Sequence, residues 1–170
     1  ALKGLGKLNE SLNSYTMSIT IDNDYADAYN NMGLVLKDQG KKDKAIDLFK
    51  KCISLRPDCA NAYNNMGLTL KDQGNLDKAL QAFTKAVFLE TNHAEAYYNL
   101  GLTLKEQGKF DEAIEAYDRA LSLKPDYFEA YNNKGNALKD QGKLEEAIST
   151  YKKAYKNLYK PYNRVWSFST

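Results

Sequence analysis

The chain has 170 residues, of which 27% are charged and 43% hydrophobic, and its formal net charge is +2. This is an ordinary composition for a folded protein, and so small a net charge argues against long-range attraction to DNA or RNA. No apolar run approaches the 18 residues that a membrane span needs, so we expect neither nucleic acid nor membrane as a partner.

A 34-residue period organises the chain from residue 26 onward. The string Ala-x-Ala-Tyr starts at Ala26, Ala60 and Ala94, and Phe128 follows at the same spacing. When these four residues are numbered as position 1, every unit has glycine at positions 8 and 15, alanine at position 20, and Phe or Tyr at position 24. The period predicts four full repeats, at residues 26–59, 60–93, 94–127 and 128–161.

The segments that flank the repeats are less regular. Residues 1–25 fit a partial repeat, the end of a helix A followed by a helix B, with Gly6 at position 15 and Tyr15 at position 24. Residues 162–170 are predicted to be a C-terminal tail or the start of a further helix A, and the alternatives of a packed cap or a loose end stay open. Neither end shows a polar cap, so we expect a fragment of a longer protein.

Each repeat predicts two helices, A and B. With the exception of Lys134 and Asn157 in the last repeat, positions 4, 7, 8 and 11 carry apolar or small residues at helical spacing, as do positions 20, 21, 24, 27, 28 and 30. Asp or Asn at position 33 is expected to cap helix A, and glycine at position 15 to end it in a left-handed conformation. Small residues at positions 8 and 20 let the two helices approach closely. The predicted fold class is all-α.

The pattern resembles the tetratricopeptide repeat (TPR) family over residues 26–161, although Thr91 stands where that family has Pro and Lys134 where it has Leu or Met. The family signature is met in the third repeat at Tyr97, Leu100, Gly101, Ala113, Tyr117 and Pro125. The resemblance implies an α-α superhelix, a TPR solenoid of four full repeats plus a partial N-terminal one. It also implies that the A helices line an inner wall that binds other polypeptides.

Asparagines on the side of helix A that points away from the core are the first candidate binding residues. They occupy position 6 (Asn31, Asn65, Asn99, Asn133) and, except in the third repeat, position 5 (Asn30, Asn64, Asn132). An Asn amide offers an acceptor and two donor hydrogens, so it can pair with both groups of a peptide unit. The row looks like the Asn ladder that holds extended peptides in the TPR domain of O-linked N-acetylglucosamine transferase. The alternative is that Asn at position 6 is simply frequent in the family.

Leucines and lysines complete the predicted peptide-binding set. Position 9 is Leu34, Leu68 and Leu102, and position 12 is Lys37, Lys71, Lys105 and Lys139. The leucines form either an exposed contact stripe or packing against the next helix A. Positions 2 and 13 are mostly acidic, although the acids at position 2 also suit a capping box.

The charges of helix A favour one kind of partner. Positions 2, 5, 6 and 9 hold no Lys or Arg, so the carboxylate clamp with which one family branch binds acidic C-termini is missing. We therefore expect a protein partner or an extended peptide that is neutral or basic.

Catalysis is not predicted. His93 is the single histidine and lies in a turn without metal-ligand spacing, so we expect a structural role for it. Cys52 reads as a small buried residue, and a total of two cysteines favours a reducing, cytoplasmic location. We expect no enzyme activity, no cofactor and no metal.

Three functions remain open at this point. The preferred one is an interaction scaffold that binds an extended peptide segment in a concave groove. The second is the substrate-recognition part of a glycosyltransferase whose catalytic domain is absent from this sequence. The third is a structural repeat module that associates end to end with other copies.

Overall fold

The computed structural model describes the backbone of residues 2–158 and the side chains of residues 10–156. Within residues 2–158 it contains nine α-helices and no strand, which confirms the predicted all-α class. The helices in chain order are α1 (Leu2–Ile21), α2 (Ala26–Asp38), α3 (Lys42–Leu55), α4 (Ala60–Lys71), α5 (Leu76–Leu89), α6 (Ala94–Glu106), α7 (Phe110–Leu123), α8 (Phe128–Asp140) and α9 (Leu144–Leu158).

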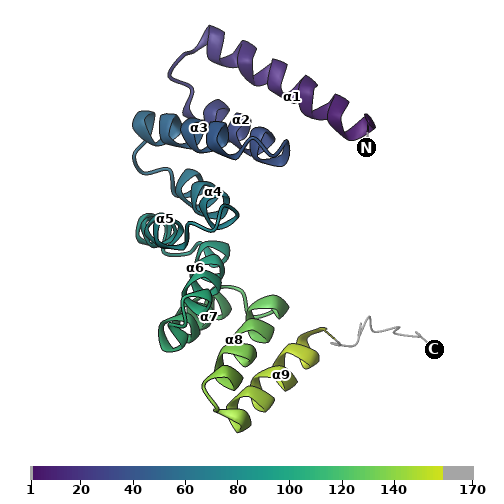
Figure 1. Ribbon diagram of the computed structural model, residues 1–170, viewed down its shortest axis with the longest axis vertical. Coiled ribbons are helices and arrows are strands. Elements are labelled where there is room, and N and C mark those ends of the chain that lie inside the picture. Colours follow the sequence, from purple (N-terminus) through teal and green to yellow (C-terminus); the bar gives the residue numbers. More distant parts are fainter. Residues whose placement is uncertain (1, 159–170) are drawn as a thin grey trace, which may run out of the picture.

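Each of the four repeats forms an antiparallel A–B helix pair, as its apolar spacing predicts. The A helices are α2, α4, α6 and α8, and the B helices are α3, α5, α7 and α9 (Figure 1). The glycine at position 15 follows each A helix with a φ between 75° and 78°, a left-handed conformation that costs other residues strain. This glycine allows the tight turn into helix B.

Two details at the helix ends differ from the sequence expectations. The N-cap residue of helix A is at position 34, not 33, and among these four caps only His93 accepts a hydrogen bond through its side chain. The expected end of a helix A at Gly6 is also wrong, because α1 runs without a break from Leu2 to Ile21. Gly6 lacks the positive φ of the four position-15 glycines, so nothing ends the helix there.

The helices stack into a curved array with the A helices on its inner side. Every A helix packs on its own B helix, and every B helix packs on the next A helix. Successive A helices also contact one another, from α2 to α4 to α6 to α8, whereas successive B helices within the described residues do not. The A helices therefore follow the shorter path round the bend, and α1 and α9 both extend to the same side of the array in Figure 1.

The glycine at position 8 sets the distance between the paired helices. A Cβ atom on Gly33 would lie 2.6 Å from Cε1 of Phe49, and one on Gly101 would lie 2.6 Å from Cε1 of Tyr117. Both aromatic residues, at position 24, are fully buried. The aromatic ring thus fills the space that the missing side chain leaves, as the small–aromatic pattern predicts.

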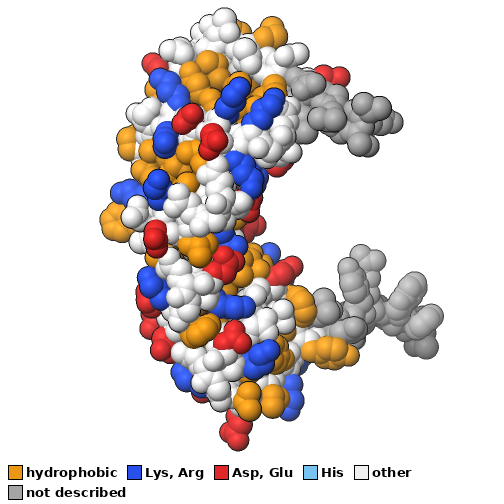
Figure 2. Space-filling view, viewed as in Figure 1, with side chains coloured by type: hydrophobic (Ala, Val, Ile, Leu, Met, Phe, Trp, Pro, Cys, Tyr) orange, Lys and Arg blue, Asp and Glu red, His pale blue; other side chains and the backbone are white. Residues whose placement is uncertain are grey.

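The last repeat shows how much apolar surface the stacking buries. At position 21, Ile46 is 7% exposed beneath α4, whereas Ile148 on α9 is 54% exposed. On the face shown in Figure 2, basic and acidic side chains are interspersed, without a large area of one sign. No helix within the described residues is long and apolar enough to span a membrane.

Candidate functional site on the inner face of the A helices

The position-6 asparagines form hydrogen bonds between repeats. Nδ2 of Asn65 donates to Oδ1 of Asn30 (3.0 Å), and Nδ2 of Asn99 donates to Oδ1 of Asn64 (3.1 Å). Each bond joins position 6 of one repeat to position 5 of the repeat before it. These amides are therefore fixed by the stacking of the A helices, and one hydrogen of each is already engaged.

The four position-6 asparagines differ in how exposed they are and in how many of their hydrogen-bonding groups are still open to a ligand. Asn65 is half-buried, and no described group donates to its Oδ1, whereas Asn99 is only 9% exposed. Asn133 uses its amide nitrogen twice, donating to the hydroxyl of Tyr98 (3.0 Å) and to the backbone oxygen of Glu129 (2.9 Å). Asn31 accepts a long bond of 3.5 Å from Asn30. Asn65, near the centre of the array, is therefore the amide that is both fixed by a neighbouring repeat and left with an open acceptor and a second hydrogen.

The position-5 residues follow the same arrangement. Asn30 and Asn64 are buried, and each accepts a hydrogen bond from the position-6 asparagine of the next repeat. Asn132 in the last repeat is exposed. Tyr98 takes this position in the third repeat and accepts through its hydroxyl oxygen. Asn30 and Asn64 thus hold the neighbouring rung in place and offer little surface to a ligand.

The position-9 leucines are half-buried and belong to the core. Leu34 packs against the cluster around Leu36 and Phe49, and Leu68 and Leu102 join the corresponding clusters of their own repeats. The leucines are thus partly covered by their own repeats, and not mainly by the next helix A as the packing alternative expected. Each leucine can offer a ligand only the part of its surface that these clusters leave uncovered.

Charged residues of the inner face are partly paired with each other. Nζ of Lys71 lies 2.7 Å from Oε1 of Glu106 in the next repeat. Lys37 and Lys105 are half-buried, and Lys139 is exposed.

The acid at position 2 of the first repeat, Asp27, is held by Arg56 through both of its carboxylate oxygens. Part of the charge that sequence reasoning assigned to a partner is therefore compensated within the chain.

Sequence reasoning missed a second set of bonds between repeats. The Gln at position 14 donates to the Asp at position 18 of the preceding repeat, with Nε2–Oδ1 distances of 2.7–2.8 Å. The pairs are Gln73 with Asp43, Gln107 with Asp77, and Gln141 with Asp111. The signal was present, because both residue types recur at fixed positions. Its meaning required the stacking geometry that brings residues 30 apart into contact.

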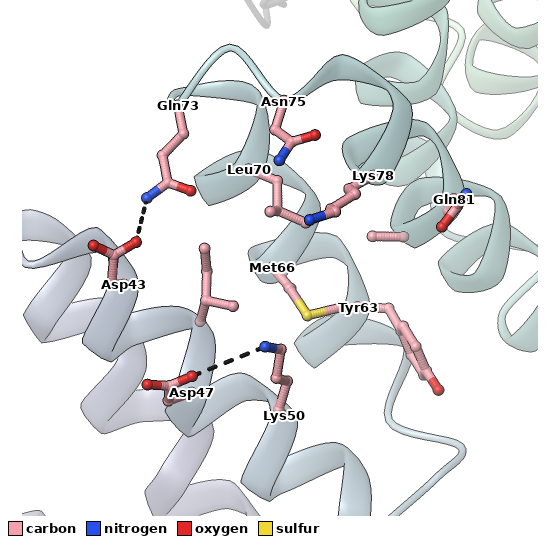
Figure 3. A pocket seen from close by; sticks show the side chains of 12 residues that line it. Asp43, Asp47, Lys50, Tyr63, Met66, Leu70, Gln73, Asn75, Lys78 and Gln81 are labelled. Atoms are coloured by element: carbon pink, nitrogen blue, oxygen red, sulfur yellow. Dashed lines mark hydrogen bonds and ion pairs between the residues drawn. The ribbon is translucent and has the colours of Figure 1, made fainter.

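The outer side of the array also carries a groove, because the backbones of successive B helices in the described residues lie farther apart than those of successive A helices. A cavity of about 550 Å³ lies between α3, α4 and α5 (Figure 3), with Ile46, Met66 and Leu70 among its apolar lining. The bond between Gln73 and Asp43 crosses one end of it. This outer groove is the alternative to the inner face as a binding surface.

His93 and the two cysteines have structural roles in the described chain. Nδ1 of His93 accepts from the backbone N–H of Ala96, so Nε2 carries the hydrogen and donates to Oδ1 of Asn61 at 3.1 Å. Cys52 and Cys59 are buried free thiols, and burial raises the pKa of Cys52 to about 12. A thiol with so high a pKa is a poor nucleophile at neutral pH. Among the described residues, no group of three or more His, Cys, Asp or Glu is placed to hold a metal ion.

Comparisons with known proteins agree with this architecture. One family model, described as TPR repeat, matches residues 1–40, 69–108 and 102–142. Two further models, both described as tetratricopeptide repeat, match residues 24–87 and 128–157. A search among curated proteins found no match.

Solved structures show the same fold over almost the whole chain. A crystal structure of MamA is 30% identical with a TM-score of 0.84, and the match covers 93% of this chain and 92% of that one. MamA from Desulfovibrio magneticus RS-1 is 22% identical with a TM-score of 0.81, over 91% of this chain and 88% of that one. YrrB, described as a TPR protein with an unusual peptide-binding site, is 24% identical with a TM-score of 0.75, over 92% and 80%. The chain belongs to the tetratricopeptide repeat family of protein-interaction scaffolds.

Proposed function

We propose that the chain binds an extended peptide segment along the inner face of its A helices. The observation that carries the proposal is the row of position-6 amides, of which Asn65, Asn99 and Asn133 are each held in a fixed orientation by a bond to the preceding repeat. Groups that are already ordered lose little conformational entropy when a ligand binds. The amide of Asn65, with its free oxygen and second hydrogen, is the best-placed partner for a peptide backbone.

The same geometry limits the affinity. A backbone hydrogen bond to one of these amides contributes a net of about 0.5–1.5 kcal/mol, against an association cost of about 4–15 kcal/mol. Since the position-9 leucines are half-buried in the core, covering them adds less than the roughly 1.5–3 kcal/mol of a fully exposed side chain. We therefore expect dissociation constants on the order of micromolar or weaker.

A comparison of inner-face and outer-groove variants tests the proposal. A peptide array identifies the best-binding sequence, and calorimetry then measures its affinity for the parent, for Asn65→Ala and for Gln81→Ala. Gln81 is an exposed side chain that lines the outer groove, so it provides a matched control for amide truncation. Circular dichroism verifies that each variant remains folded.

The proposal predicts weaker binding by Asn65→Ala and unchanged binding by Gln81→Ala. If Gln81→Ala weakens binding while Asn65→Ala does not, the outer groove is the site. Unchanged affinity in both variants excludes the central part of both surfaces.

A second candidate, self-association, is favoured by the exposed face of α9. Leu144 and Ile148 are 59% and 54% exposed at positions that the next helix A covers in the earlier repeats. A helix of a second copy would bury this apolar surface. Solution mass measured against concentration, for the parent and for Ile148→Lys, tests the idea. A parent that stays monomeric throughout the concentration range contradicts it.

A further inference from the structure

Two tyrosines lie side by side where α6 meets α8, and one of them replaces the asparagine that the other repeats have at position 5. Tyr98 stands at position 5, and Tyr127 is the N-cap residue of α8. Their ring centroids are 4.9 Å apart, with an angle of 40° between the ring planes. Asn133 donates to the hydroxyl of Tyr98 and so holds this ring in place. The pair is a fixed aromatic surface on a wall that elsewhere carries amides.

Two carboxylates next to the tyrosine pair lack counter-ions. Glu95 lies in the first turn of α6 and Glu129 in the first turn of α8; both are exposed, and neither forms an ion pair with another described residue. Burial, together with the electrostatic effects of Tyr98, Glu95 and Glu129, raises the pKa of Tyr127 to about 12. Glu95 lies one helical turn before Tyr98 on the same side of α6. Asn133 donates both to the hydroxyl of Tyr98 and to the backbone oxygen of Glu129, which brings Glu129 to the same junction.

The corresponding places in the first two repeats are uncharged or neutralised. In the first repeat, Arg56 pairs with Asp27 at position 2. In the second repeat, position 2 is Asn61, which bonds His93. Uncompensated negative charge beside aromatic rings is therefore confined, among the first turns of these A helices, to the junction of α6 and α8.

A cation already lies on this aromatic surface. Nζ of Lys124 is 4.5 Å from the ring centroid of Tyr127. An ammonium group at this distance is attracted by the negative face of the ring. Lys124 is itself exposed and follows the last residue of α7, so its side chain can swing away into water. The ring thus accepts a cation, and the chain's own lysine is a replaceable occupant.

We infer that the cluster of Tyr98, Tyr127, Glu95 and Glu129 binds an arginine or lysine side chain of the segment held on the inner face. This inference rests on the proposed function and adds the chemistry of one residue of the partner. Arginine suits the site best, because its planar guanidinium can stack on a tyrosine ring while its N–H groups reach the carboxylates. The asparagine amides bind the peptide backbone whatever its side chains are, and this cluster adds a preference for peptides that carry a basic residue.

Matched peptides test the inference directly. The probes are two capped peptides of alternating Ala and Ser, one with a central arginine and one with citrulline, which has nearly the same shape but no charge. Calorimetry at low ionic strength measures both against the parent protein. We expect the arginine peptide to bind about fivefold more tightly, and the difference to shrink as salt screens the carboxylates.

Three variants locate the preference. Glu95→Gln/Glu129→Gln removes both carboxylates with little change of shape. Tyr98→Asn installs the position-5 residue of the other repeats, which accepts the bond from position 6 equally well. The control, Glu112→Gln/Glu115→Gln, makes the same chemical change at two exposed acids of α7, a B helix. The first two variants should lose the preference for arginine, and the control should keep it.

The outcomes separate this inference from the proposed function. If the preference is equal in the Glu95→Gln/Glu129→Gln variant and in its control, the cluster is not the cation site. If the parent binds both peptides equally and Asn65→Ala weakens both, the inference is wrong and the inner-face proposal stands. If the parent binds neither peptide, both fail.

Discussion

Tyr117 and Tyr151 occupy the same position in successive repeats, and replacing each by phenylalanine should change stability in opposite directions. Both are at position 24, next to the glycine at position 8. The hydroxyl of Tyr151 donates to Oδ1 of Asn136 at 2.7 Å. The hydroxyl of Tyr117 is buried without a hydrogen-bond partner, because position 9 of its repeat is Leu102 instead of Asn.

The structure sets the size of each effect. A buried polar group without a partner costs about 1–3 kcal/mol, so Tyr117→Phe should stabilise the protein by about 1 kcal/mol once the small space left by the oxygen is considered. Tyr151→Phe loses a hydrogen bond worth a net of about 0.5–1.5 kcal/mol and leaves Asn136 unpaired. For a chain of this size, 1 kcal/mol corresponds to roughly 2–4 °C in Tm.

Thermal and urea unfolding followed by circular dichroism measure both variants. Cooperativity in a repeat array is limited, so midpoints are compared under identical conditions. Leu102→Asn, made in the parent and in the Tyr117→Phe background, provides a further control, since the new amide can pair with the hydroxyl only in the parent. A Tyr117→Phe midpoint at or below that of the parent would refute the reasoning.

Three further predictions follow from the core and the turns. Gly101→Ala should lower Tm, because overlap of the new Cβ with Tyr117 costs about 1–3 kcal/mol and exceeds the roughly 1 kcal/mol gained in helix propensity; a raised Tm contradicts this. The raised pKa of Tyr127 makes the folded state favour the neutral phenol, so its contribution to stability is complete below pH 10 and is lost as pH rises towards 12. Ultraviolet absorbance of tyrosinate during an alkaline titration, compared with a Tyr127→Phe variant, measures this. Cys52 and Cys59 should resist a thiol reagent in the native protein and react together on unfolding, and rapid native labelling would show that they are not buried.

The period of 34 residues was enough to predict the architecture. Glycine at position 15 predicted where each A helix ends, and glycine at position 8 predicted the contact with the aromatic residue at position 24. These are local consequences of residue size and backbone freedom, so a single sequence reveals them. Gly6 misled because glycine permits a helix end without requiring one, and α1 continues through it.

The sequence predicted where the candidate site residues lie, but not which hydrogen bonds they form with one another. Sequence alone places Asn65 on the inner side of helix A, but it does not show that Asn30, 35 residues earlier, already accepts one of its hydrogens. The half-buried state of Leu68 likewise depends on how repeats stack. Such contacts are set by the curvature of the array, which a residue pattern does not encode directly.

The most direct measurement of the central claim is the NMR response of individual side-chain amides to a bound peptide. The NH₂ resonances of Asn65 and Gln81 are assigned from their disappearance in Asn65→Ala and Gln81→Ala. Addition of the best-binding peptide at a saturating concentration should shift the Asn65 resonances and leave those of Gln81, in the outer groove, unchanged. A shift at Gln81 with none at Asn65 would contradict binding along the inner face of the A helices.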